Sequence, residues 1–444
     1  MAETQRSWCV VGGGMLGLTL AWRLSEVGQQ VTVVEAAPEL GGLASAWQLG
    51  GITWDRHYHV TLLSDSFLRT LLKEIDLDDE FEWRITQTGF YADGGLFRLN
   101  NAIDYLKFPP LNFIDKVRLA GTIMYASRIE DGRSLERVPL TEWLIKLSGK
   151  RVFELIWRPL LRAKLGDNYT QASASFIWAV IRRLYAARRS GLKTEMFGFI
   201  PGSYDRILKR LSERLTARGV SLELGCPVES IERTGNGVQV RSRLGDQQYD
   251  QVVVTLAGPL ASKVCVGLKP EEKERLEGIV YQGIVCASLV LKRPLTQYYL
   301  TYITDETIPF TAIVEMTALI GTEQLDGQSL IYLPRYVTSE DPYWALSDAE
   351  VEEHFMAGLR RMHPGLAPDD ILAFRISRVR QVLAISTLNY SDRLPPMITS
   401  VPGLHVVNSA HIVNGTLNVN ETVGLAESAM PKLLAAAEPS GQSD

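Results

Sequence analysis

One pattern near the start of the chain constrains its fold more than any other. It consists of a strand, a glycine-rich turn with the spacing Gly12-x-Gly14-x-x-Gly17, a helix, a second strand and then Glu35. The first glycine permits a tight turn, the second lets a pyrophosphate approach the backbone, and the third lets the helix pack closely on the strand. An ordinary glycine-rich turn is the alternative interpretation. The flanking strands, the helix and the acid favour a Rossmann-type dinucleotide-binding unit.

Size and composition narrow the class further. The 444 residues exceed what one hydrophobic core usually organises, so we expect at least two packed domains. The net charge of −5 disfavours a nucleic-acid partner, and no apolar segment is long enough for a transmembrane helix or a signal peptide. The four cysteines form no CxxC pair, which predicts reduced thiols, a cytoplasmic protein and no metal site.

Patterns typical of a nucleotide-binding domain appear three times, near residues 12–45, 220–256 and 404–430. The first stretch ends with a second glycine pair, Gly41-Gly42, at a loop-to-helix transition. A simple nicotinamide dehydrogenase would place its chemistry soon after the first unit. Because these patterns recur late in the chain, they indicate a dinucleotide-binding protein of another kind.

This distribution resembles the FAD-dependent amine oxidase superfamily, which includes protoporphyrinogen oxidases, phytoene-type desaturases and, more distantly, UDP-galactopyranose mutase. The chain is most similar to a bacterial branch with a His-Tyr-His element and a Trp-x-Pro-Leu-Leu-x-x-Lys-x-Gly run. The residues that carry the resemblance, over essentially the whole chain, are Gly12 to Gly17, Glu35, Gly41 to Ala44, Asp55 to His59, Trp157 to Gly166, Val228, Val252 to Thr255 and Asn408 to Met430.

The resemblance implies an α/β fold with three parts. A discontinuous FAD-binding domain of the Rossmann type would comprise residues 1–95, 196–265 and 400–435. Residues 96–195 are rich in helix-forming apolar patterns and would form an inserted helical lobe that faces substrate or membrane. Residues 266–399 would form a substrate domain with an antiparallel sheet and a helix. That helix is expected over residues 348–362, with Ser347 as its N-cap.

The resemblance also implies roles for individual residues toward FAD. Gly12, Gly14 and Gly17, with Met15 and Leu16, would hold the ADP pyrophosphate, and Glu35 the adenosine ribose. The stretch Gly41, Gly42, Leu43 and Ala44 would line the pyrophosphate and ribityl chain, and Val228 would pair with adenine through its backbone. The helix that begins near Asn420, Glu421 and Thr422 would direct its N–H groups at the flavin N1 and C2 carbonyl.

Two positions depart from the relatives. Leu43 stands where many of them have arginine, and Asn408-Ser409 stands where most carry Gly-Asp or Gly-Glu. The carboxylate that would bind the ribityl hydroxyls is therefore missing, and we expect Asn408 or Ser409 to replace it.

Three histidines are candidates for chemistry. His57 and His59 are two residues apart, so on a strand both would point to one side, where one could accept a proton or bind substrate. A structural pair and a histidyl link to the flavin are the alternatives. His411 lies in a polar segment that we expect to surround the flavin, with a plain polar loop as the alternative; its polar members are Asn414, Thr416, Asn418, Asn420 and Glu421.

Residues 158–193 carry eight basic residues and one acid, Asp167, interleaved with aromatic residues. The basic residues are Arg158, Arg162, Lys164, Arg182, Arg183, Arg188, Arg189 and Lys193. Such a basic face could bind anionic lipid headgroups, which would bring a cytoplasmic protein to the membrane periphery, or an anionic substrate. A solvated helix face is the alternative.

The leading hypothesis is an FAD-dependent oxidoreductase, of the oxidase or desaturase type, that removes two electrons from an apolar or amphipathic small molecule. The alternative is a non-redox sugar isomerase resembling UDP-galactopyranose mutase, in which the basic run would bind a diphosphate. A third hypothesis, supported only by the altered Asn408-Ser409 segment, is a flavin-binding protein without catalysis. The sequence gives no oligomeric state.

Overall fold

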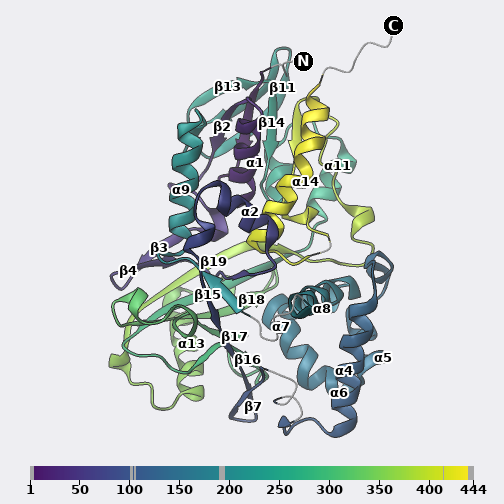
Figure 1. Ribbon diagram of the computed structural model, residues 1–444. Helices are drawn as coiled ribbons and strands as arrows, with labels where there is room; N and C mark the ends of the chain where they lie inside the picture. The colour runs from purple at the N-terminus through teal and green to yellow at the C-terminus, as the bar shows by residue number, and fades with distance from the viewer. Residues whose placement is uncertain (1–4, 101–103, 105–106, 190–195, 414, 439–444) are drawn as a thin grey trace.

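The computed structural model describes residues 5–100, 104, 107–189, 196–413 and 415–438. Its upper part in Figure 1 is built on a five-stranded parallel sheet of order β10-β2-β1-β14-β20. These strands are Ser221–Glu223 (β10), Gln30–Val34 (β2), Ser7–Val11 (β1), Gln251–Val254 (β14) and Leu404–Val406 (β20). Three stretches of chain therefore meet in one sheet, as the three nucleotide-domain patterns predict.

Helices cover one face of this sheet and a second β layer covers the other. The helices are α1 (Met15–Glu26), α2 (Ser66–Glu74), α9 (Ser203–Ala217) and α14 (Val419–Ala437), and they share a continuous apolar core with β1 and β2. The opposite face packs on β11 (Val228–Thr234), β12 (Gly237–Ser242), β13 (Gly245–Tyr249), α10 (Gly258–Val264) and α11 (Pro270–Glu277). Because both faces are covered, β1, β14 and β20 are almost entirely buried, whereas the edge strand β10 has no fully buried residue.

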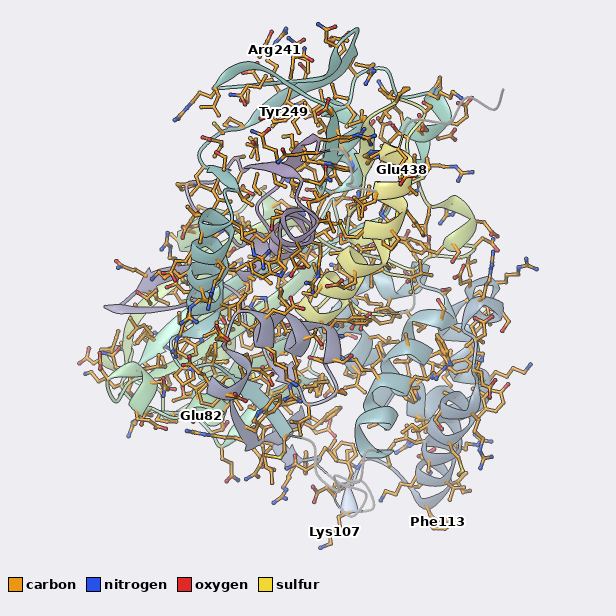
Figure 2. All side chains as sticks on the ribbon, turned by 45° about the horizontal axis from the view of Figure 1, so that its top comes forward. Glu82, Lys107, Phe113, Arg241, Tyr249 and Glu438 are labelled. Carbon is orange, nitrogen blue, oxygen red and sulfur yellow. The ribbon has the colours of Figure 1, made fainter. Side chains whose placement is uncertain are left out.

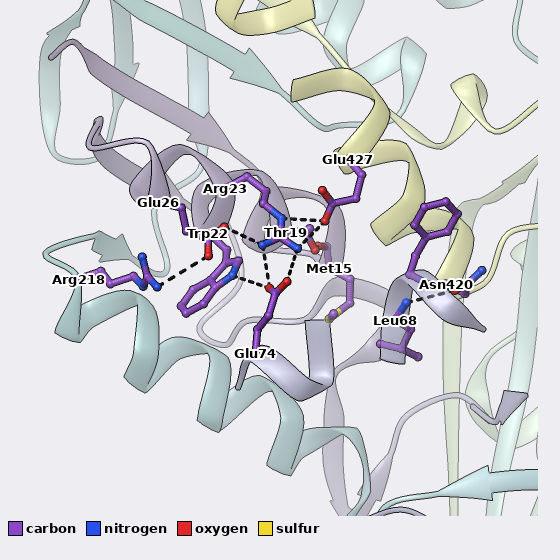
Figure 3. A network of polar contacts seen from close by, with 11 residues as sticks. Met15, Thr19, Trp22, Arg23, Glu26, Leu68, Glu74, Arg218, Asn420 and Glu427 are labelled. Carbon is purple, nitrogen blue, oxygen red and sulfur yellow. Dashed lines mark hydrogen bonds and ion pairs between the residues drawn. The ribbon is translucent and has the colours of Figure 1, made fainter. Parts of the chain in front are cut away.

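A polar network ties α1, α2 and α14 together on the outer side of this core (Figure 3). The Arg23 guanidinium on α1 pairs with Glu26 at 2.6 Å, with Glu74 on α2 at 2.7 Å and with Glu427 on α14 at 2.7 Å. Nearer the start of α14, the Asn420 Oδ1 accepts hydrogen bonds from the backbone N–H groups of Phe67 and Leu68 at 3.0 and 3.1 Å. These contacts fix the direction of α14 relative to α1.

The lower part contains a seven-stranded sheet of order β19-β15-β18-β17-β16-β7-β8, in which only the β16–β7 pair is parallel. The strands are Ile371–Ala384 (β19), Tyr281–Leu291 (β15), Ser329–Val337 (β18), Ala312–Glu315 (β17), Tyr298–Ile303 (β16), Gln87–Ala92 (β7) and Gly95–Arg98 (β8). Helix α13 (Asp348–Met362) packs on it, and its N-cap is Ser347, as the sequence predicts. The short helix α12 (Thr317–Ile320) follows β17.

The sheet pairing differs from the predicted domain boundary at residue 95. Strands β7 and β8 both pair within the seven-stranded sheet, so residues 87–98 belong with the substrate sheet.

Two small sheets complete the strands. They are the hairpin of β3 (Ala46–Leu49) and β4 (Ile52–Asp55), and the sheet of β5 (Thr61–Leu62), β6 (Glu82–Ile85) and β9 (Met196–Phe199).

The inserted lobe is helical, as predicted. It contains α4 (Phe113–Arg128), α5 (Leu140–Ser148), α6 (Lys150–Val152), α7 (Arg158–Leu165) and α8 (Ala174–Arg189), which bury their own apolar cluster (Figure 1). None of the described helices combines the length and apolarity that a membrane crossing requires. The four cysteines are buried thiols.

Candidate functional site

A cavity of about 590 Å³ lies at the carboxyl end of the parallel sheet. Its walls include Gly12, Gly14 and Met15 at the turn from β1 to α1, and Thr255 and Leu256 directly after β14. Ligands of open α/β sheets bind at this edge, because the turns after the strands and the N-termini of the helices meet there. The cavity is therefore where a dinucleotide is expected.

The glycine turn has the geometry that the sequence predicts. Gly12 has a φ of +113°, and a Cβ added to Gly17 would lie 1.9 Å from the Gly12 carbonyl oxygen, so helix and turn touch directly. Gly17 acts through this packing and does not line the cavity. A Cβ added to Gly14 would meet no atom within 4 Å, which leaves the space beside it free for a ligand.

The second glycine pair lies against the first. The Gly41 N–H donates to the Gly13 carbonyl oxygen at 2.8 Å, and Gly41 has a φ of +110°. Gly41, Leu43 and Ala44 line the cavity, whereas Gly42 does not. Leu16 lines it as well.

Glu35 lines the cavity, but its carboxylate also holds the turn. Its two oxygens accept hydrogen bonds from the N–H groups of Gly13 at 2.6 Å and Ala37 at 2.8 Å. Val228, the residue predicted to meet adenine, begins β11 and does not line the cavity. The predicted roles of Glu35 and Val228 toward the nucleotide stay predictions.

His57 and His59 both line the cavity. They lie in a loop after β4, so the prediction that they point to one side of a strand was wrong. The His57 Nδ1–H donates to the Leu43 carbonyl oxygen at 3.4 Å, and the His59 Nδ1–H donates to the His57 carbonyl oxygen at 2.9 Å. Burial lowers the pKa of His57 to about 3 and the pKa of His59 to about 4. Both rings are therefore neutral and weakly basic.

The second nitrogen of His57 is informative about a ligand. His57 Nε2 is buried and has no hydrogen-bond partner among the described residues. With the proton on Nδ1, Nε2 is an acceptor in a cavity wall, and a buried acceptor without a partner is costly. This atom fits a hydrogen-bond donor on a bound cofactor.

His411 is placed elsewhere, contrary to the prediction of a catalytic role. It ends the short helix Ser409–His411, where its Nε2–H donates to the Pro395 carbonyl oxygen at 3.0 Å and its Nδ1 accepts from the Asn408 N–H at 3.2 Å. The ring does not line the cavity. Both nitrogens are engaged with backbone, so His411 stabilises the turn.

Of the two residues expected to replace the missing carboxylate, Ser409 lines the cavity. The Asn408 side chain is engaged within the protein, because its Nδ2 donates to the Leu256 carbonyl oxygen at 2.9 Å and its Oδ1 accepts from the Ala410 N–H at 3.1 Å. Ser409 is thus the better placed candidate.

The start of α14 faces the cavity, with a register that differs from the prediction. The helix begins at Val419 with Asn418 as N-cap, and the residues that line the cavity are Asn418, Val419, Thr422 and Leu425. Asn420 and Glu421 point elsewhere, because only positions spaced by three or four residues share one side of a helix. Thr416 also lines the cavity, whereas Asn414 is outside the described residues.

A second cavity, of about 790 Å³, opens between the helical lobe and the large sheet. Its walls are mainly apolar side chains of α4, α7, α8, β16 and β17, such as Ile123, Leu160, Ile177 and Val314. No carboxylate is among the described residues that line it. The two cavities adjoin, because they share the wall residues Tyr58, Lys164, Val180, Tyr299, Leu300, Tyr302 and Thr416.

The predicted basic face of residues 158–193 is not one surface. Arg158 pairs with Glu154 and Glu306, Arg162 pairs with Asp167 and Glu306, and Arg183 pairs with Asp65. Arg182 lies over the Trp178 ring, and Lys164 lies in the cavity walls. Lys193 lies outside the described residues, as do the side chains of Arg188 and Arg189. Three of the five basic side chains that the structure describes here are therefore paired with acids.

The parallel sheet, the glycine turn and the adjoining apolar cavity define a dinucleotide-binding protein with a separate substrate domain. Residues 16–418 match the family described as flavin containing amine oxidoreductase, so the chain belongs to that family. The predictions of this family and of FAD as cofactor are confirmed. The family also agrees with the prediction of an FAD-dependent oxidoreductase.

Two relatives with named activities are similar to part of the chain. The chain is 40% identical to a coproporphyrinogen III oxidase of Mycobacterium tuberculosis over 329 residues, which is 65% of this chain and 67% of the relative. It is 23% identical to a probable zeta-carotene desaturase of Synechococcus elongatus, over 51% of each chain. The match thus spans about half of the desaturase and two thirds of the oxidase.

Solved structures confirm the fold. An oxidoreductase from Methanosarcina mazei has a TM-score of 0.76 at 17% identity, over 96% of this chain and all of that chain. A reduced UDP-galactopyranose mutase has a TM-score of 0.73 at 15% identity, over 99% of this chain and 98% of that chain.

Sequence reasoning missed several residues in the cavity walls, including Tyr58, Thr255 and Tyr299. Thr255 could have been found, because it directly follows a predicted buried strand of the parallel sheet. Tyr58 and Tyr299 carried no signal, since they belong to elements whose packing is set by residues far away in sequence.

Gly14→Ala should weaken FAD binding by about tenfold or more, because the added methyl group enters space that the glycine leaves free for the ligand. The thermal midpoint of the ligand-free protein should not fall, since no protein atom lies within 4 Å of that position. Titration of the flavin-free protein with FAD measures this. Gly121→Ala, on the exposed side of α4, is the control and should bind FAD like the wild type. If Gly14→Ala binds FAD as tightly as the wild type does, the glycine turn is not the FAD-binding site.

His57→Asn should make the protein less sensitive to acid. The folded-state pKa of His57, about 3, is lower than its usual value of 6.5, so the unfolded chain binds a proton that the folded chain excludes. Stability is therefore lost as the pH falls below 6.5, by about 1.4 kcal/mol per pH unit for one such group. Thermal midpoints across this range should decline less steeply in His57→Asn, whereas the exposed His354→Asn should follow the wild type. Parallel curves for all three proteins would refute the proposed burial of a neutral ring.

Proposed function

We propose that this protein is an FAD-dependent oxidoreductase, of the oxidase or desaturase type, that removes two electrons from an apolar or amphipathic small molecule. The observation that carries the proposal is the apolar cavity of about 790 Å³ that adjoins the cofactor cavity. When bound, FAD would supply the hydride acceptor. The relatives named a zeta-carotene desaturase and a coproporphyrinogen III oxidase support this reaction class.

The chain's own residues would bind and orient the cofactor and the substrate. The turn from Gly12 to Gly17 would hold the pyrophosphate at the N-terminus of α1, and His57 Nε2 would accept a hydrogen bond from the cofactor. The N–H groups at the start of α14 would stabilise the negative charge that develops on reduction. The apolar walls would keep water away from the reacting carbon.

The sugar isomerase alternative has less support. It needs a basic site for a diphosphate, yet Arg158, Arg162 and Arg183 are already paired with acids. An apolar cavity is also a poor match for a sugar nucleotide. The likeness to UDP-galactopyranose mutase supports a shared fold only. The non-catalytic alternative is disfavoured by Ser409, which keeps a polar group in the cavity wall at the altered segment.

The reaction class is tested by anaerobic reduction. Mixing the FAD-loaded protein with a panel of isoprenoid polyenes, porphyrinogens, aliphatic amines and sugar nucleotides should bleach the flavin with an apolar or amphipathic compound. Val180→Glu, which places a carboxylate in the wall shared by the cavities, should abolish the bleaching while FAD stays bound. Catalytic conversion of a sugar nucleotide without net flavin reduction would favour the isomerase.

We also propose a peripheral membrane contact, through α4 instead of residues 158–193. Phe113, Ile114 and Val117 are exposed to 75%, 64% and 55%, and Figure 2 shows Phe113 at the edge of the helical lobe. The exposed charges of α4 are basic, Arg118 and Arg128, while Asp115 is buried, so this face is complementary to anionic lipids. Lys116, Ala120 and Met124 of the same helix line the apolar cavity, so lipid-dissolved substrate would enter beside the contact.

Vesicle sedimentation tests this contact. The wild type should bind vesicles containing phosphatidylglycerol, and a variant with Phe113→Ser and Ile114→Ser should lose most of that binding with an unchanged thermal midpoint, since both side chains are exposed. Phe67→Ser, an exposed apolar residue on α2, is the control and should bind like the wild type. Equal sedimentation of all three proteins would contradict the proposal.

A further inference from the structure

One lysine of the described part of the chain lies where the two cavities adjoin. Lys164 on α7 is in the walls of both, together with Tyr58 on the loop after β4 and Tyr299 on β16. We call this place the throat. Whatever enters the apolar cavity and reaches toward the cofactor passes this lysine.

Among the described residues, none compensates the charge of Lys164. No described residue forms an ion pair or hydrogen bond with its amine, in contrast to Arg158, Arg162 and Arg183 around it. No described carboxylate lines the apolar cavity. The cofactor cavity has one, Glu35, which is bonded to the backbone of the glycine turn.

The other polar groups at the throat are neutral or positive. Burial raises the pKa of the Tyr58 and Tyr299 phenols well above their usual value, so both stay protonated. His59 is neutral, and the Lys164 charge contributes to its lowered pKa. Burial, followed by the charge of Arg183, lowers the pKa of Lys164 to about 8. An anion beside this amine would relieve its desolvation cost.

We propose that Lys164 is the anion-binding residue of the substrate site, and that the substrate is an amphipathic molecule with one acidic group, a carboxylate or a phosphate, on an apolar body. This inference rests on the proposed function and names its substrate class. The acidic group pairs with Lys164 in the throat, and the apolar body fills the larger cavity. The acidic end, and not the far end of the apolar body, is therefore presented to the cofactor cavity.

Binding of simple amphiphiles to the FAD-loaded protein tests the inference. The probes are dodecanoate, dodecyl phosphate and dodecanol, followed by calorimetry below their aggregation limits. The wild type should bind at least one of the two anions about tenfold or more tightly than the alcohol. Lys164→Met should lose this preference while still binding the alcohol, because the apolar walls are unchanged. The anion that is preferred identifies the acidic group.

Lys116→Met is the matched control, since Lys116 lines the same cavity on α4 but not the throat. It should keep the preference. The ligand-free Lys164→Met protein should be at least as stable as the wild type, because the substitution removes a buried charge without a partner. Equal binding of the three probes by the wild type, binding of none of them, or loss of the preference in Lys116→Met alone would overturn the inference.

These measurements need no turnover. A protein that binds dodecanoate through Lys164 but whose flavin no compound reduces would contradict the proposed function and leave the anion site intact. Flavin reduction by an uncharged substrate that is equally fast in Lys164→Met would support the proposed function and contradict the anion site.

Discussion

The contact between Gly17 and the Gly12 carbonyl oxygen is the constraint on which the rest of this structure depends. With only 1.9 Å between that oxygen and the place of a Cβ, any other residue at position 17 would push α1 away from the turn. This close approach aims the N-terminus of α1 at the cavity. At its far end, Arg23 pairs with acids on α2 and α14, so the two helices whose N-termini face the cofactor are held as one unit.

The electrostatics of the site follow from how little charge it contains. Burial keeps His57 and His59 neutral, and each Nδ1–H donates to a backbone carbonyl oxygen, while the role of either ring as a proton acceptor stays a prediction. We propose that the N–H groups at the start of α14 would stabilise negative charge that develops at the cofactor. Lys164, the one cation in the walls for which the described residues supply no partner, lies where the two cavities adjoin, so charge selects the substrate while shape and apolar surface hold its body.

Much of this architecture is contained in local sequence patterns. The glycine turn, the predicted strands of the parallel sheet and helix α13 with its Ser347 cap are each determined by residues close in the chain, and each was predicted. The predictions failed where contacts between residues far apart in the sequence determine the position of a side chain or strand. His411 bonds to Pro395, sixteen residues away, and Asn420 bonds to the start of α2, so both polar side chains turn from the cavity. Strands β7 and β8 join the large sheet through β16, a pairing that no local pattern reveals.

The absorbance spectrum of the purified protein, recorded before and after denaturation, tests the central claim most directly. The account predicts the two visible bands of an oxidised flavin and release of the chromophore as FAD into the supernatant. A featureless spectrum that added FAD does not change would contradict the cofactor site and the oxidoreductase function built on it.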